Sequence, residues 1–229
     1  MPWGDCAVVP GGGWLVAMTE VVTRGSGEHE VAADQAELRV TYAANAADRS
    51  RAVEALGDRV AAVDAVLRGE AMAHAVQVRQ RSMHVGDRWD RKRRVGATAQ
   101  LQLVLRVTDL AVLDDLFAAL LSAEPEWLDG PHWSLADETA AVREAQRLAV
   151  ADARARAEAY AETLGGKLGA LLKLSDEGAE RPYPVMRAAS MAFAAEGAPV
   201  SRDSVQQLGL VPEQVTMRAA CTACWSLLD

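Results

Sequence analysis

The segment from Glu138 to Leu174 reads ETAAVREAQRLAVADARARAEAYAETLGGKLGALLKL and carries the strongest structural pattern in the chain. Apolar residues recur in it at intervals of three and four, which is the spacing of one face of an α-helix. Asp137 stands where an N-terminal cap belongs, and Gly165 stands where a left-handed residue closes many helices. The sequence therefore predicts a long helix over Glu138–Leu164, followed after two glycines by a short strand.

Most residues in the apolar stripe of this helix are alanines, so the helix can approach a sheet closely. Tyr160 and Leu164 are expected to add bulk to that contact near the end of the helix. Asp152 and Arg156 stand four residues apart and are expected to form an exposed ion pair. The full stripe consists of Val142, Ala145, Ala149, Ala153, Ala157, Tyr160 and Leu164.

Patterns with the period of a strand or of a helix predict the other elements. Ahead of the long helix, the first elements are a strand pair over Glu20–Gly27 and Gln35–Ala43 and a helix over Ala47–Arg68. The residues of this helix expected to face the core are Val53, Leu56, Val60, Val63 and Leu67. There follow a hairpin of strands over His74–Val85 and Val95–Val107, a helix that starts at a Thr108 cap and ends before Pro125, and a short strand over Trp133–Leu135. Beyond it, a loose segment over 175–213 with a helical turn at Met186–Phe193 leads to a closing strand from Val215. The order ββαββαβαββ predicts an α+β protein with three helices packed on antiparallel sheets, as one domain over 18–229 or as two sub-lobes of it.

Composition and charge exclude several classes of protein. The chain has 229 residues, half of them apolar, which is enough to bury a substantial core. Its formal net charge of -8 argues against a dedicated nucleic-acid binder and against a polybasic membrane-surface protein. Its apolar runs fall short of the ~20 residues that a membrane-spanning helix needs. We therefore expect a globular protein without a membrane span and without a nucleic-acid partner.

The N-terminal stretch has little of the pattern of a folded segment. Residues 1–17 are expected to be a disordered extension, and Met18 is an alternative start of the protein. The apolar patch Trp14–Met18 is short and has no Lys or Arg before it, which makes it a poor signal peptide. A cytoplasmic location is the expectation that follows.

Residues that could carry chemistry are scattered. Cys221 and Cys224 match C-x-x-C, but they fall in a strand pattern whose residues three apart point to opposite faces, so they are not expected to share a disulfide or a metal. The four histidines lack the spacing of metal ligands. A search for a nucleophile elbow, a phosphate-binding glycine loop and a zinc helix finds none of these motifs. The sequence therefore predicts a non-enzymatic protein without a cofactor or a metal.

The densest cluster of charge lies between the two strands of the predicted hairpin. One interpretation is a docking patch, in which an aromatic ring stacks while basic side chains bind phosphate or a neighbouring acidic protein surface. Its candidate residues are Trp89, Arg91, Lys92, Arg93 and Arg94. The other interpretation is a solvated turn whose charges prevent edge-to-edge aggregation. The sequence leaves both interpretations open.

Two stretches of the chain resemble the SIMPL-domain family, a group of largely unknown function that includes bacterial periplasmic immunogenic and oxidative-stress-defence proteins. The first is VTRGSGE at 22–28 with ADQAEL at 33–38, and the second is the helix-to-strand block over Ala145–Leu174. Two features depart from the family: Ala33 stands where relatives often have proline, and the export signal of many relatives is not recognised.

The resemblance implies an α+β subunit that forms a homo-oligomer, and some relatives resemble channel-like rings. It also implies a structural or interaction role, linked to stress by family analogy. The alternative is a small-molecule- or lipid-binding protein with a pocket between helices and sheet, closed by the segment 175–213.

Overall fold

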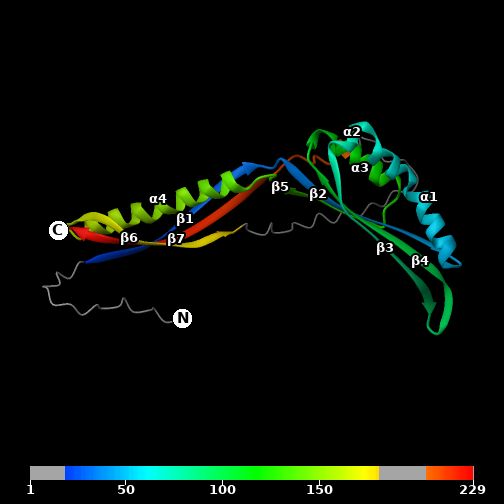
Figure 1. Cartoon of the computed structure of the whole chain (residues 1–229), viewed down its shortest axis with the longest axis horizontal. Coiled ribbons are helices and arrows are strands. Elements are labelled where there is room, and N and C mark those ends of the chain that lie inside the picture. The colour runs from blue at the N-terminus through cyan, green and yellow to red at the C-terminus, as the bar shows by residue number, and fades with distance from the viewer. Residues whose placement is uncertain (1–18, 181–204, 229) are drawn as a thin grey trace. The chain divides into compact units, whose positions relative to one another are not determined.

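The computed structural model describes residues 19–180 and 205–228 and confirms the α+β architecture (Figure 1). The elements are β1 (Glu20–Ala32), β2 (Gln35–Ala46), α1 (Arg49–Arg68), α2 (Glu70–Ala73), β3 (Val76–Asp90), β4 (Arg93–Val107), the 3-10 turn η1 (Leu110–Val112), α3 (Leu113–Ser122), β5 (Trp127–Ser134), α4 (Thr139–Thr163), β6 (Lys167–Glu180) and β7 (Gln214–Leu228). The predicted order of strands and longer helices is correct, and the short α2 and η1 are additions to it. The expected extension over 1–17 and the helical turn over Met186–Phe193 lie outside the described residues.

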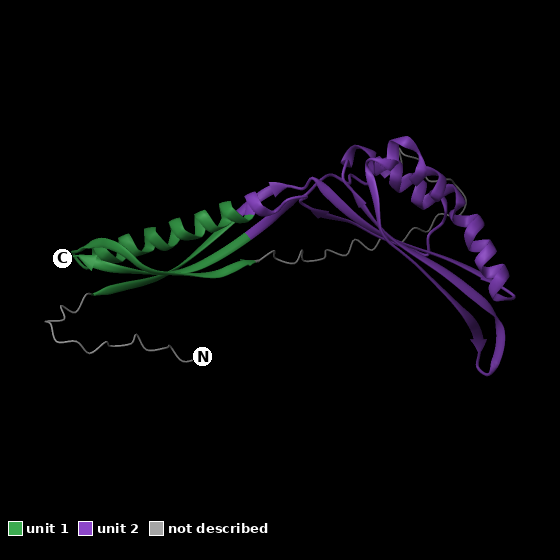
Figure 2. Ribbon diagram, in the orientation of Figure 1, with its two compact units in different colours: residues 1–28, 142–180, 218–229 green, residues 29–141, 181–217 purple. Residues whose placement is uncertain are grey.

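The chain divides into two compact units (Figure 2). Unit 1 comprises residues 1–28, 142–180 and 218–229, and unit 2 comprises residues 29–141 and 181–217. Each unit has its own sheet, with the strand order β1-β7-β6 in one and β3-β4-β2-β5 in the other.

Unit 2 is a four-stranded antiparallel sheet with α1 and α3 on one face. The inward side chains of β2 and β4 lie opposite each other in register, with Val40 beside Leu103 and Tyr42 beside Leu101. The hydroxyl of Tyr42 donates to the carbonyl oxygen of Leu120 in α3 at 3.0 Å, and burial raises the pKa of Tyr42 above its usual range. This bond joins the sheet to the helix layer, and it gives a hydrogen-bond partner to a hydroxyl group that is buried in the core.

The ends of the helices in unit 2 differ in detail from the prediction. Asp48 caps α1, which therefore starts at Arg49, and its Oδ1 accepts the backbone N–H of Arg51 at 2.9 Å. Thr108 does not cap α3, because its hydroxyl donates to the carbonyl oxygen of Ala75. Asp109 caps the 3-10 turn that precedes α3 instead.

Residues of α1 also differ from the predicted stripe. Val53 is 38% exposed, and Ala52 is buried in its place.

β5 begins at Trp127, six residues earlier than the predicted strand, because this stretch pairs with β2 from Thr41 onward.

The predicted pairing of the first two strands is wrong. β1 lies beside β7, whereas β2 lies between β4 and β5. The two residues between them would suit a tight hairpin, but their N–H groups bond elsewhere: Ala33 donates to Glu213 at 3.0 Å and Asp34 donates to Ser134 at 3.2 Å. Both strands have the period-two pattern, and that pattern does not specify a partner.

Unit 1 is a three-stranded sheet with α4 lying over β1. A Cβ atom on Gly25 would lie 2.0 Å from the carbonyl oxygen of Ala149, and one on Gly27 would lie 2.2 Å from that of Ala145. The hydroxyl of Thr23 donates to the carbonyl oxygen of Ala153 at 2.7 Å. Helix backbone and strand backbone are therefore in direct contact at Gly25 and Gly27, which is possible only because these two residues have no side chain.

The buried row of α4 confirms the alanine stripe and corrects its end. Tyr160 and Leu164 are 59% and 67% exposed, so they do not add bulk to the contact. Residues four apart lie along a row inclined by about 26° to the helix axis, and a twisted strand can follow such a row. The buried row consists of Ala141, Ala145, Ala149, Ala153, Ala157 and Ala161, so Ala141 takes the place of the predicted Val142, which is half-buried.

The start of the predicted loose segment belongs to the sheet. Residues 175–180 continue β6 and pair with β7, with Ser175 beside Thr222 and Ala179 beside Ala219. Within the remainder of that segment, Val205 is fully buried in the core of unit 2.

Replacing Gly25 with Ala should destabilise the protein by about 1–3 kcal/mol, because the added methyl group overlaps helix backbone that has no room to move. Gly57→Ala in α1 is the matched control, since nothing lies within 4 Å of its added Cβ and Ala favours a helix by up to about 1 kcal/mol. Urea unfolding followed by circular dichroism compares the two variants. Equal stability of Gly25→Ala and the wild type would contradict the contact.

Candidate functional site

The β3–β4 hairpin extends beyond the sheet to which it belongs. Its strands pair from Val76 beside Val107 to Asp90 beside Arg93. The neighbouring strand β2 ends at Ala46, opposite Ala97. Residues 88–96 therefore form a two-stranded tip without a third strand, and we call these residues the hairpin tip.

Gly96 stands where the hairpin leaves the sheet. Its φ of +151° lies in a region that other residues rarely adopt, and a Cβ there would lie 2.5 Å from the carbonyl oxygen of Ala46. A glycine at this position lets the hairpin pass close to the end of β2. At the turn itself, Arg91 adopts a positive φ of 54°.

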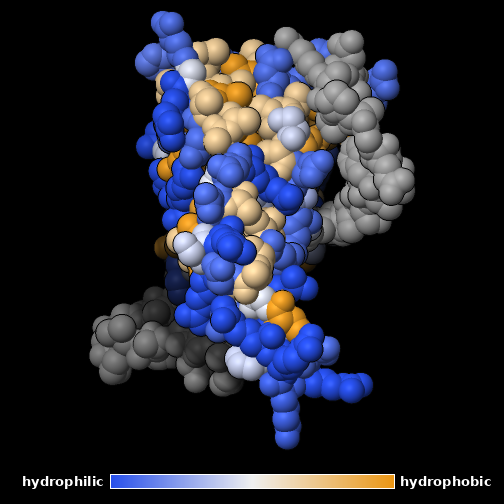
Figure 3. All heavy atoms as spheres, turned by 90° about the vertical axis from the view of Figure 1, so that its right-hand side faces the viewer, coloured by the Kyte–Doolittle hydropathy of each residue, from blue (hydrophilic) through white to orange (hydrophobic). Residues whose placement is uncertain are grey.

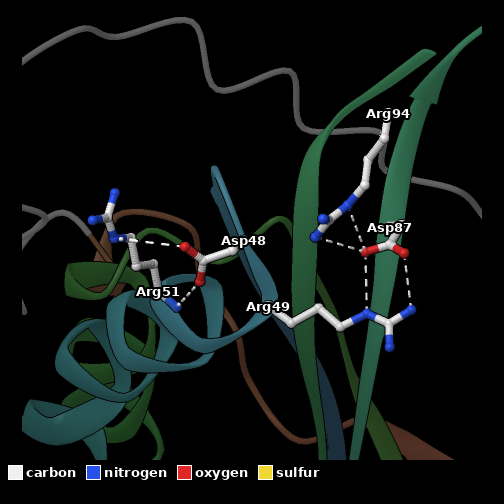
Figure 4. Close-up of polar contacts among 5 residues, drawn as sticks. All are labelled: Asp48, Arg49, Arg51, Asp87 and Arg94. Carbon is white, nitrogen blue, oxygen red and sulfur yellow. Dashed lines mark hydrogen bonds and ion pairs between the residues drawn. The ribbon is translucent and has the colours of Figure 1, made fainter.

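An ion cluster anchors the base of the hairpin tip (Figure 4). Asp87 accepts two hydrogen bonds from Arg49 at the start of α1, at 3.1 Å from Nε and 2.9 Å from Nη2. Arg94, on the opposite strand, donates from Nε to the same carboxylate at 3.1 Å. Hydrogen bonding to Arg49, more than any other contact, lowers the pKa of Asp87 from its usual range. One carboxylate therefore ties both strands of the hairpin to the helix.

The neighbouring Asp48 has a separate role in the same view (Figure 4). Its side chain caps α1 through the N–H of Arg51 and lies 3.6 Å from the Nε of that residue. The cap holds the first turn of α1, and thereby the backbone that carries Arg49, in place.

Four basic side chains of the hairpin tip are exposed and make no ion pair with any residue in 19–180 or 205–228. They are Arg88, Arg91, Lys92 and Arg93. Trp89 is 61% exposed and Val95 is 42% exposed beside them. In Figure 3, which looks onto this end of the molecule, strongly hydrophilic side chains form the lowest part of the described surface. The tip thus combines unpaired positive charge with an exposed aromatic ring.

The structure brings most of the predicted docking patch together at this tip. Arg94 is the exception, because its guanidinium bonds to Asp87 and faces the anchor. The anchor itself was missed by sequence reasoning. Arg49 and Asp87 are separated by 38 residues, and no local pattern signals such a pair.

A second exposed surface lies on β6 in unit 1. Among the described strands, β7 alone pairs with β6, and the side chains of residues 171–179 are all exposed. Leu171, Leu172 and Leu174 are 44%, 47% and 48% exposed. Leucines that are half exposed on an edge strand are an unusual use of apolar surface, because an edge of this kind is prone to pairing.

The other edge of the same sheet is protected. Asp152 of α4 accepts the backbone N–H of Ser26 in β1 at 3.0 Å, and this bond, ahead of the ion pair with Arg156, lowers the pKa of Asp152. The expected pair of Asp152 with Arg156 is therefore confirmed, and the carboxylate also occupies one free donor of the β1 edge.

The cysteines lie on opposite faces of β7, as the alternation predicted. Cys221 is buried and Cys224 is partly exposed, and the two do not form a disulfide with each other. Burial is the main cause that raises the pKa of the Cys221 thiol. The thiol of Cys224 donates to the carboxylate of Glu20 at 3.2 Å. Within the described residues, no three His, Cys, Asp or Glu side chains lie close enough together to hold a metal ion.

The alternative hypothesis places a ligand pocket between the helices and the sheet. The space between α1, α3 and the sheet of unit 2 is packed with buried apolar side chains. Two hollows lie instead on the opposite, polar face of that sheet. They are lined by Thr41, Ser82, Met83, His84, Gln100 and Gln102, and by Glu37, Arg39, Arg79, Gln80, Gln102, Val104 and Arg106.

Comparison with known families identifies the family of the chain. The model of the SIMPL family, described as a protein of unknown function (DUF541), matches residues 21–225. The chain therefore belongs to the SIMPL family, which confirms the resemblance seen in its sequence. No curated protein matches the chain. Among the helices of the described residues, none is both long and apolar enough to cross a membrane.

Replacing Asp87 with Asn should loosen the hairpin tip while leaving the sheet intact, because Arg49 and Arg94 lose their shared charge partner. Amide hydrogen exchange should show lower protection in residues 88–96 than in the wild type. Asp58→Asn is the matched control, since Asp58 is an exposed residue of α1. Unchanged protection at the tip in Asp87→Asn would contradict the anchoring role.

The anchor should also respond to acid. The pKa of Asp87 is lowered from 3.8 in the folded protein, so its stabilisation is present above that value and is lost as pH falls through the lowered folded pKa. Tip protection relative to the sheet should therefore fall in strong acid in the wild type. Asp87→Asn should lack this step.

Proposed function

We propose that this SIMPL-family chain is a non-enzymatic protein that self-associates through the β6 edge of unit 1 and acts as a structural or interaction module. The observation that carries the proposal is the exposure of Leu171, Leu172 and Leu174 on an edge strand. Its non-enzymatic character rests on the search of the sequence for catalytic motifs. A stress-related role is part of the proposal by family resemblance alone, and a cytoplasmic location is part of it because Trp14–Met18 makes a poor signal peptide.

The energetics of the leucines support pairing between copies. Full burial of a leucine side chain is worth about 1.5–3 kcal/mol relative to exposure, so covering three half-exposed leucines is worth a few kcal/mol per copy. Pairing of β6 with β6 would add backbone hydrogen bonds to that gain. A two-fold axis between two β6 strands would bury both leucine clusters at once.

The polar side chains of β6 are compatible with this arrangement. Glu177 is turned back across its own sheet, since its carboxylate pairs with Arg24 at 2.6 Å and accepts from the hydroxyl of Thr222 at 2.6 Å. The end of β6 that carries leucines is therefore the part available for pairing. The β1 edge is less suited to it, because Asp152 already bonds the N–H of Ser26.

Replacing Leu171 and Leu174 together with Ser should shift the protein toward monomer, because both side chains would leave the proposed contact. Light scattering during size-exclusion chromatography measures the mass at several protein concentrations. The matched control is Val53→Ser with Val211→Ser, which removes two exposed apolar side chains, 38% and 67% exposed, from unit 2. It should assemble as the wild type does.

Circular dichroism spectra identical to that of the wild type would show that the β6 variant is folded. A wild-type protein that stays monomeric at every concentration would overturn the proposal. So would a folded β6 variant that keeps the wild-type mass.

A further inference from the structure

We infer that the hairpin tip is a docking surface for a membrane that contains anionic phospholipid. The inference goes beyond self-association and does not depend on it. It rests on the unpaired charge of the tip, on the exposed Trp89, and on the projection of the tip beyond the third strand of its own sheet.

The first step is the chemistry of the tip. Arg88, Arg91, Lys92 and Arg93 are exposed and lack an ion-pair partner among the described residues. Basic side chains near an anionic lipid surface each increase partitioning by about fivefold. Asp90 reduces this attraction in part, so the tip retains a clear excess of positive charge.

The second step is the aromatic side chain. Trp89 is 61% exposed, and Val95 is 42% exposed on the opposite strand. Tryptophan favours the zone of lipid headgroups, where its ring meets apolar chains and its N–H meets polar groups. A lipid surface has phosphate groups outside and hydrocarbon beneath them. The four basic side chains of the tip suit the phosphate groups, and Trp89 and Val95 suit the apolar layer beneath.

The third step explains how an acidic chain can approach an anionic surface. The net charge is -8, and the positive tip means that the rest of the chain is more acidic than that. The turn at Arg91 lies four residues beyond the Asp87–Ala97 pair, which is roughly 13 Å at about 3.3 Å per residue. The Debye length in physiological salt is about 8 Å. Charges of unit 2 at or behind the Asp87–Ala97 pair are therefore largely screened from a flat surface that touches the turn.

The size of the tip argues against a folded protein as the partner. A stable protein interface takes about 20–30 residues on each side. The tip has nine residues, from 88 to 96, so it offers too little surface for such a contact. Attraction to lipid headgroups acts one residue at a time and needs no large complementary surface.

Co-sedimentation of the full-length protein with vesicles tests the inference. One set of vesicles is phosphatidylcholine alone, and the other is an equal mixture of phosphatidylcholine and phosphatidylglycerol. The wild type should bind the mixed vesicles at low salt, bind them less as salt is raised, and bind pure phosphatidylcholine weakly. The variant Arg88→Ser, Arg91→Ser, Lys92→Ser, Arg93→Ser should lose roughly several hundredfold in partitioning, because each of the four basic residues is worth about fivefold.

A charge-matched control separates a local surface from overall charge. It carries four substitutions on α4, Arg143→Ser, Arg147→Ser, Arg154→Ser and Arg156→Ser, and should bind as the wild type does. Fluorescence adds a readout at the tip itself. The emission of Trp89, obtained as the difference between wild type and Trp89→Phe, should shift to shorter wavelength with mixed vesicles only.

Three outcomes would overturn the inference. They are a wild type that ignores mixed vesicles at low salt, a tip variant that binds as well as the wild type, and an α4 variant that loses binding to the same degree. Tip-dependent binding to polyglutamate, or to a single-stranded oligonucleotide, in the absence of vesicle binding would assign the tip to an acidic protein or to nucleic acid instead. Circular dichroism confirms that each variant is folded, and the mass measured by light scattering shows independently whether self-association holds.

Discussion

The direct contact between the backbones of α4 and β1 is the constraint on which unit 1 depends. The helix lies so close to Gly25 and Gly27 that neither position has room for a side chain, and the residues of the helix that face the sheet are a row of alanines. A helix is about 10 Å wide and strands lie about 4.8 Å apart, so one helix covers about two strands. With the helix fixed over one edge of the sheet, β6 at the other edge stays uncovered. The contact that holds unit 1 together therefore also determines which of its edges is exposed.

In unit 2 the main constraint is different, because a long hairpin extends beyond the end of its sheet and has to be held there. A two-stranded ribbon is marginally stable by itself. Here the carboxylate of Asp87 ties the ribbon to the first turn of α1 through Arg49, and Gly96 lets the ribbon pass the end of β2. Because Arg94 is part of this anchor, the remaining basic side chains of the tip are presented on a backbone with a defined direction.

Local periodicity was sufficient to predict the order of the elements, the β3–β4 hairpin and the alanine stripe of α4. It failed where the answer depends on a partner that is distant in sequence. β1 and β2 have the right pattern for a hairpin, yet each pairs with a strand encoded elsewhere. The outward direction of Tyr160 depends on the twist of the strand under α4. The exposed residues of the tip were found from a run of charged residues between two strand patterns, whereas the pairing of Arg49 with Asp87 across 38 residues depends on the tertiary fold.

The two exposed surfaces differ in the force that they use, and this makes their roles separable. Burial of the β6 leucines between two copies would be driven by the hydrophobic effect, which added salt does not weaken. Attraction at the hairpin tip is electrostatic and is screened within about 8 Å in physiological salt. A single tip with four unpaired cations gives modest affinity. If copies associate through β6 and their tips reach one membrane together, each contact after the first becomes intramolecular. Self-association would then convert a weak surface contact into a strong one without any change at the tip.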